Sequence, residues 1–175
     1  MLSKFTSSDP VKEALAVIES FSESVDPIIL FNDLGLTLRV FQTQSKLFPN
    51  KNLDAYINFR GRHPSGDYIG VSNKNPLYLF KIYSYAMLWY SLYERNFYKD
   101  SESILIPIDS YESLKGTDAF VFAHEILLPS SMIEEDYSDL FNVFSYFQAV
   151  EMLAKVYEVP TNIIEERLKE LDIIS

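Results

Sequence analysis

The chain has 175 residues, no cysteine and a formal net charge of −10 at neutral pH. Its length suits one domain with a sizeable core, and 47% hydrophobic and 15% aromatic residues exclude a disordered chain. The lack of cysteine excludes disulfides and thiolate metal sites. The acidic balance argues against direct binding to nucleic acid, because phosphates favour clustered Lys and Arg. No apolar run reaches the roughly 18 residues of a membrane span, and the polar N-terminus lacks a signal-peptide core. We therefore expect a cytoplasmic protein without membrane or nucleic-acid contacts.

The chain up to Gly35 predicts two helices. Asp9 is a suitable N-cap and Pro10 suits the first helical position, and apolar residues then recur at helical spacing to about Ser24. A shorter helix is predicted over 28–34, where Gly35 is well placed to end it in a left-handed conformation.

Three strand-like runs follow, at 36–41, 53–59 and 68–72. Turn-rich segments separate them. Short strands joined by short loops predict an antiparallel meander. A further extended piece is predicted over 104–108.

The rest of the chain predicts helices. The run 77–95 is apolar almost all round, which is typical of a central, buried helix. A helix over 114–128 ends at Pro129, because proline interrupts the hydrogen-bond ladder. Two more helices are predicted over 140–156 and 161–171.

We expect a single domain spanning 1–175. Its parts are an N-terminal helix (1–25), a short helix with the sheet (26–75) and a helical part (76–175). The fold class is α+β, with a small antiparallel sheet of about three strands packed against a mostly helical bundle.

Five segments, in this order, have the spacing of a known family. Residues 33–38 read DLGLTL and 68–72 read YIGVS, which suit the strands before the family's active helix. Residues 119–129 read AFVFAHEILLP and keep the alanine, phenylalanine, leucine and proline positions of the helix that comes after it. Residues 153–160 (LAKVYEVP) and 167–171 (RLKEL) are similar to its C-terminal helices.

Together these segments resemble the ImmA/IrrE family of metallo-endopeptidase-like proteins, over roughly residues 26–173. The resemblance implies a zincin-like minimal core and, in the family, a zinc ion. An HExxH helix supplies two imidazoles to that zinc and a glutamate as general base for its bound water.

The positions that correspond to the metal site hold other residues. The alignment places Met87, Leu88 and Ser91 where the family has His, Glu and His. Gly116 stands at the acidic third ligand, with Asp118 as the nearby carboxylate. Met and Leu are not effective zinc ligands, and one serine does not replace an imidazole. We therefore expect a degenerate site with no catalytic residue, no metal and no cofactor.

Neither histidine suggests a rebuilt site. His124 and Glu125 begin like HExxH, but a leucine occupies the second histidine position. We expect both on a solvated helix face, and His63 exposed in a Gly/Pro loop. A Ser91–His124–Asp118 triad has no nucleophile elbow to support it.

The last two helices have features of a helix-turn-helix. Ala154, Val159 and Leu168 lie roughly where such motifs keep small and apolar residues. However, residues 155–172 carry five acidic and three basic side chains, which would repel phosphate. We expect two packed helices that do not read DNA.

Aromatic residues crowd two helices and allow two interpretations. The two groups are Tyr83, Tyr85, Trp89, Tyr90, Tyr93, Phe97 and Tyr98, and then Phe141, Phe144, Tyr146 and Phe147. Most of them are expected to fill the core. The alternative is that some line a groove for a peptide or protein, with Trp89 or Tyr90 as the anchor if either is exposed.

The resemblance implies a peptidase-like protein that acts by protein binding. In the family such proteins control helix-turn-helix repressors of phages or mobile elements, so a repressor of this kind is the expected partner. Two alternatives remain open: an active zinc endopeptidase of the same family that cleaves a repressor, and a toxin or host-defence component. An enzyme with an unrecognised site is a further alternative.

Overall fold

The computed structural model describes residues 9–20, 25–41, 53–59, 67–94 and 104–175. The chain divides into two compact units, Met1–Ile126 and Leu127–Ser175, which we describe separately. Within the described part, no helix is both long enough and apolar enough to cross a bilayer.

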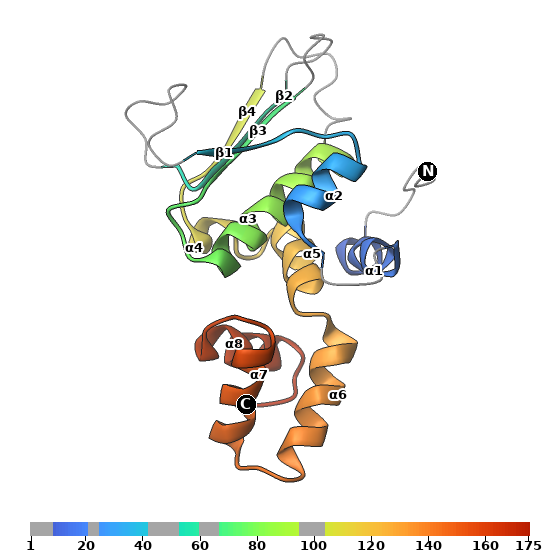
Figure 1. Ribbon diagram of the computed structural model, residues 1–175, viewed down its shortest axis with the longest axis vertical. Helices are drawn as coiled ribbons and strands as arrows, with labels where there is room; N and C mark the ends of the chain where they lie inside the picture. Colours follow the sequence, from blue (N-terminus) through green and yellow to red (C-terminus); the bar gives the residue numbers. More distant parts are fainter. Residues whose placement is uncertain (1–8, 21–24, 42–52, 60–66, 95–103) are drawn as a thin grey trace. The chain divides into compact units, whose positions relative to one another are not determined.

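The first unit contains helices and all the strands of the described part (Figure 1). The helices are α1 (Pro10–Ser20), α2 (Pro27–Asp33), α3 (Leu77–Trp89), its π-helical continuation η1 (Tyr90–Glu94), α4 (Tyr111–Leu114) and α5 (Asp118–Leu127). The strands are β1 (Leu38–Phe41), β2 (Ala55–Phe59), β3 (Tyr68–Ser72) and β4 (Ile104–Ile108). The α+β class is confirmed.

The sheet is mixed, with the strand order β1-β3-β2-β4. Strand β2 runs antiparallel to both β3 and β4, whereas β1 pairs with β3 in parallel. The expected three-stranded meander is therefore wrong in its first pairing and in its number of strands. The extended piece Ile104–Ile108 pairs with the largely buried β2 and leaves the more exposed β1 at the opposite edge.

Helix α1 begins at Pro10 as its sequence signal predicts, and α2 begins and ends beside its predicted cap residues. The Asp26 side chain accepts hydrogen bonds from the backbone N–H groups of Ile28 and Ile29, at 2.8 and 3.1 Å. Gly35 has φ +69°, and the Leu36 N–H donates to the Phe31 carbonyl at 2.8 Å, which closes the helix end. Residues 21–24, in the predicted end of the first helix, lie outside the described residues.

Helix α3 is the centre of the first unit. All its residues from Ile82 to Trp89 are buried, and it packs against β2 and β3 (Figure 1). Because nearly every position is apolar, all of its faces can be covered by protein. Helix α5 lies alongside, since the rings of Trp89 and Phe122 are 5.3 Å apart. The expected packing of the sheet on this helix is confirmed.

Gly70 in β3 faces Tyr56 in β2 across the antiparallel pair. A Cβ atom at Gly70 would overlap the Tyr56 ring, which is itself buried. The glycine is therefore required for close approach of a ring to the backbone and not for a turn.

The second unit consists of three helices. They are α6 (Ser130–Phe141), α7 (Tyr146–Val156) and α8 (Thr161–Glu170). Helix α6 begins in a stretch after Pro129 for which the sequence predicted no helix. Its polar sequence explains this, because only Ile133 and Tyr137 of α6 are buried. A capping box between Ser145 and Gln148 starts α7 later than predicted.

A buried arginine holds the second unit together. Arg167 is 6% exposed, and its Nε donates to the Leu128 carbonyl at 3.0 Å. Its Nη1 forms an ion pair with the Glu170 carboxylate at 3.2 Å. These bonds link α8 to the segment that precedes α6.

Candidate functional site

The three residues that the expected resemblance aligns with metal-site positions, Met87, Leu88 and Ser91, lie inside the core. Met87 and Leu88 are fully buried in α3, and Ser91 is buried in η1. A thioether, an isobutyl group and one hydroxyl do not provide the nitrogen or carboxylate ligands that zinc requires. Within the described ranges, no three His, Cys, Asp or Glu residues are grouped for a metal. The residues present do not fit a zinc centre.

Asp118, at the start of α5, lies within electrostatic range of Glu94, the last residue of η1. Burial raises the pKa of the Glu94 carboxyl, the Trp89 indole lowers it and the Asp118 carboxylate raises it further. The sequence placed Asp118 near this helix but missed Glu94, although it is the first carboxylate after the apolar run 77–93. Gly116 has φ +77° and forms the turn that leads into α5.

Trp89 and Tyr90 were expected to anchor a partner only if exposed, and both side chains are buried. They are 3% and 8% exposed. The Trp89 ring stacks on Tyr93 at 4.3 Å. Its Nε1 is buried and makes no hydrogen bond of ordinary geometry to the described residues, although Glu94 lies close enough to be affected by it. Both side chains fill the core.

The buried Tyr83 and the half-buried Tyr93 donate hydrogen bonds to carboxylates. The Tyr83 hydroxyl donates to Asp54 at 2.9 Å, and the Tyr93 hydroxyl donates to Glu13 at 2.8 Å. Burial and the adjacent carboxylate raise the pKa of each phenol well above its ordinary value. These bonds connect α3 and η1 to neighbouring segments.

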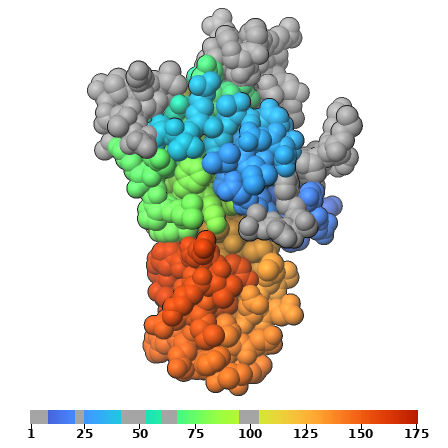
Figure 2. Space-filling view, in the orientation of Figure 1, coloured from blue at the N-terminus to red at the C-terminus, as the bar shows by residue number. Residues whose placement is uncertain are grey.

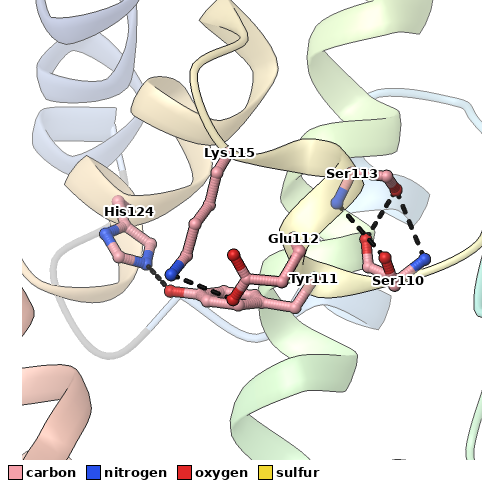
Figure 3. Close-up of polar contacts among 6 residues, drawn as sticks. All are labelled: Ser110, Tyr111, Glu112, Ser113, Lys115 and His124. Atoms are coloured by element: carbon pink, nitrogen blue, oxygen red, sulfur yellow. Dashed lines mark hydrogen bonds and ion pairs between the residues drawn. The ribbon is translucent and has the colours of Figure 1, made fainter.

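His124 and Glu125 are buried, each with 1% exposure, so the expectation of a solvated helix face is wrong. The Tyr111 hydroxyl lies 2.9 Å from His124 Nε2, and the Phe120 ring packs 4.1 Å from the imidazole (Figure 3). The short helix α4 covers this face of α5, which the amphipathic pattern of α5 alone did not reveal.

Polar residues at the two ends of α4 make further contacts (Figure 3). The Lys115 ammonium lies 4.8 Å from the centre of the Tyr111 ring and 3.1 Å from the Glu112 carboxylate (Figure 3). Ser110 and Ser113 cap the start of α4 through each other's side chains. His124 Nε2 contacts the Tyr111 hydroxyl, and this contact joins α5 to α4. His63 lies outside the described residues.

The second unit exposes large apolar side chains where α6 turns into α7. We call the group Phe141, Val143, Phe144 and Phe147 the α6–α7 surface. Phe141 is 52% exposed and Phe147 is 74% exposed. Most of the aromatic residues in the two groups were expected to fill the core, but Phe141, Phe144 and Phe147 do not, because Ile133 and Val150 are among the residues that complete the core of α6 and α7. Phe97 and Tyr98 lie outside the described residues.

Two shallow grooves flank Phe141. The larger, about 680 Å³, is lined by Tyr137, Phe141, Tyr146, Glu165, Lys169 and the chain end at 173–175. The smaller, about 480 Å³, shares Tyr137, Phe141 and Ile173 with the first and includes Glu134. Tyr137 stacks on Phe141 with ring centres 5.4 Å apart. Aromatic and apolar walls with acidic groups can take apolar and basic side chains together.

Compared with known proteins, the sequence matches no family model and no curated protein.

Proposed function

We propose that this protein is a catalytically degenerate, ImmA/IrrE-like protein that acts by binding another protein. The observation that carries the proposal is the complete burial of Met87 and Leu88, at the positions where the family has zinc-binding and general-base side chains. An active helix must present its ligands to a substrate, whereas α3 is covered on every side from Ile82 to Trp89. Hydrolysis through this helix is therefore not the function that we propose.

The exposed aromatic groups of the second unit support a binding role. Monomeric proteins rarely leave neighbouring phenylalanines in water without a use for them, and aromatic side chains are enriched at interface centres. The α6–α7 surface offers such groups beside grooves of a size that side chains fill.

The partner that we propose is a DNA-binding regulator of the helix-turn-helix type, as in phages and mobile elements. DNA-binding domains are basic, and this chain carries a net charge of −10. Opposite charge increases the rate and specificity of association more than its affinity, so binding is expected to weaken as salt rises. Such binding would keep the regulator from its operator without cutting it.

The test is co-expression of the protein, without a histidine tag, with a small helix-turn-helix repressor encoded beside its gene. We expect a complex by size-exclusion chromatography with light scattering, an intact repressor by mass spectrometry, and far less than one zinc per chain by elemental analysis. Repressor fragments that appear without EDTA and vanish with it would refute the proposal. The variant Met87→Leu is the matched control, since it removes the only sulfur at these positions and is expected to change neither result.

A further inference from the structure

The charge of the chain is concentrated in the unit that carries the exposed phenylalanines. Residues 127–175 contain ten acidic and three basic side chains, so this unit contributes −7 of the total charge of −10. One of the three basic groups, Arg167, is buried and paired with Glu170. All residues of this unit are described, and they are coloured orange to red in Figure 2. The unit that carries the grooves is therefore strongly acidic as a whole.

The acidic groups lie at the grooves and not only elsewhere on the unit. Glu165 and Lys169 both line the larger groove, where the Glu165 carboxylate accepts a hydrogen bond from the Tyr146 hydroxyl at 3.1 Å. Glu134 lines the smaller groove from the exposed side of α6. Basic side chains that flank an apolar stripe would meet these carboxylates.

The secondary structure of the unit favours a helical conformation for the bound segment of its partner. One mode of binding an extended peptide adds a strand to the edge of a sheet, and residues 127–175 contain helices and turns but no strand. Grooves between helices instead take the apolar face of an amphipathic helix, with anchors at i, i+3 or i+4, and i+7.

We infer that the α6–α7 surface and its two grooves bind a basic amphipathic helix of a partner protein. The apolar stripe of that helix packs on Phe141 and Phe147, and its Lys or Arg residues face Glu134 and Glu165. Nucleic acid and anionic membranes are repelled by the same charge, as is a second copy of this unit. The inference rests on the proposed binding function and specifies its surface and the chemistry of its partner.

The test uses the full chain and a fluorescein-labelled peptide of about four helical turns that alternates Leu and Lys in an amphipathic pattern. A peptide with Glu in place of Lys is the charge control. We expect saturable binding of the Leu/Lys peptide by fluorescence anisotropy and no binding of the Leu/Glu peptide. The affinity for the Leu/Lys peptide should fall several-fold as salt is raised from about 0.05 to about 0.5 M. Equal binding of the two peptides would overturn the inference.

Variants localise the binding. We expect Phe141→Ala and Phe147→Ala each to weaken binding by about tenfold and Glu134→Lys to weaken it several-fold. Leu77→Ala and Glu19→Lys change equally exposed groups of the first unit and are expected to have no effect. All five positions are exposed, and thermal melts check that each variant folds. Loss of binding in the controls to the same extent, or a dimer that Phe141→Ala dissolves, would contradict the inference.

The same variants separate this inference from the proposed function. If a repressor complex forms but survives Phe141→Ala and Phe147→Ala together, the surface is wrong and the binding function stands. If the Leu/Lys peptide binds as expected but the co-expressed repressor is cleaved, the surface stands and the degenerate function is wrong.

Discussion

Replacement of Arg167 by alanine is expected to destabilise the second unit by about 3–5 kcal/mol. The Nε bond to the buried Leu128 carbonyl, at 3.0 Å, is a charge-assisted hydrogen bond worth about 1.5–3 kcal/mol. The ion pair with Glu170 adds about 0.5 kcal/mol, because the Glu170 side chain is 32% exposed and screened by solvent. Loss of the packed aliphatic stem contributes a further 1–2 kcal/mol or so.

The measurement is urea denaturation followed by circular dichroism, since all three elements of this unit are helices. Arg167→Lys is the informative comparison: it keeps the charge but lacks the planar group that reaches both partners, so we expect an intermediate loss. Lys169→Ala, an exposed change on the same helix, is the control and should lie within about 0.5 kcal/mol of the unaltered protein. A loss below about 1 kcal/mol for Arg167→Ala would show that these bonds do not hold the unit together.

Three further predictions concern the first unit. Gly70→Ala should cost about 1–3 kcal/mol in the same assay, because the new methyl group collides with the buried Tyr56 ring; unchanged stability would contradict that packing. Tyr111→Phe should cost about 1–3 kcal/mol, since it removes a hydroxyl from the buried His124 ring while keeping the aromatic contacts, and Tyr111→Leu should cost more. Because the pKa of Tyr83 is raised in the folded state, stability should be constant below the unfolded value near 10 and fall as pH rises above it. Tyr83→Phe should reduce that alkaline loss, as measured by the pH dependence of the unfolding free energy, and an equally steep loss in the variant would exclude this phenol as a cause.

The all-round apolar character of residues 77–95 predicted a central, buried helix, and α3 is buried from Ile82 to Trp89. The Asp118 carboxylate raises the pKa of Glu94 at the end of η1, and the meeting of the aligned positions in one site stays a prediction. What the aligned residues do in the cell stays a prediction, to be tested by the repressor and metal experiments above. The aromatic residues were assigned less well, because a phenylalanine has the same apolar character in a core and in an interface. Phe122 is fully buried and Phe147 is mostly exposed, and nothing in their local sequence separates them.

The sequence by itself determined the local features of this protein. Asp26 and Gly35 mark the ends of α2, because a side-chain acceptor and a left-handed residue act within a few positions. The all-round apolar character of α3 determined its burial, since such a helix has no face that suits water. Only the tertiary structure decided the pairing of β1 with β3, the burial of His124 under Tyr111, and the exposure of Phe141 and its neighbours. Each of these depends on which distant segment packs against a given sheet edge or helix face, and short-range sequence patterns do not specify that segment.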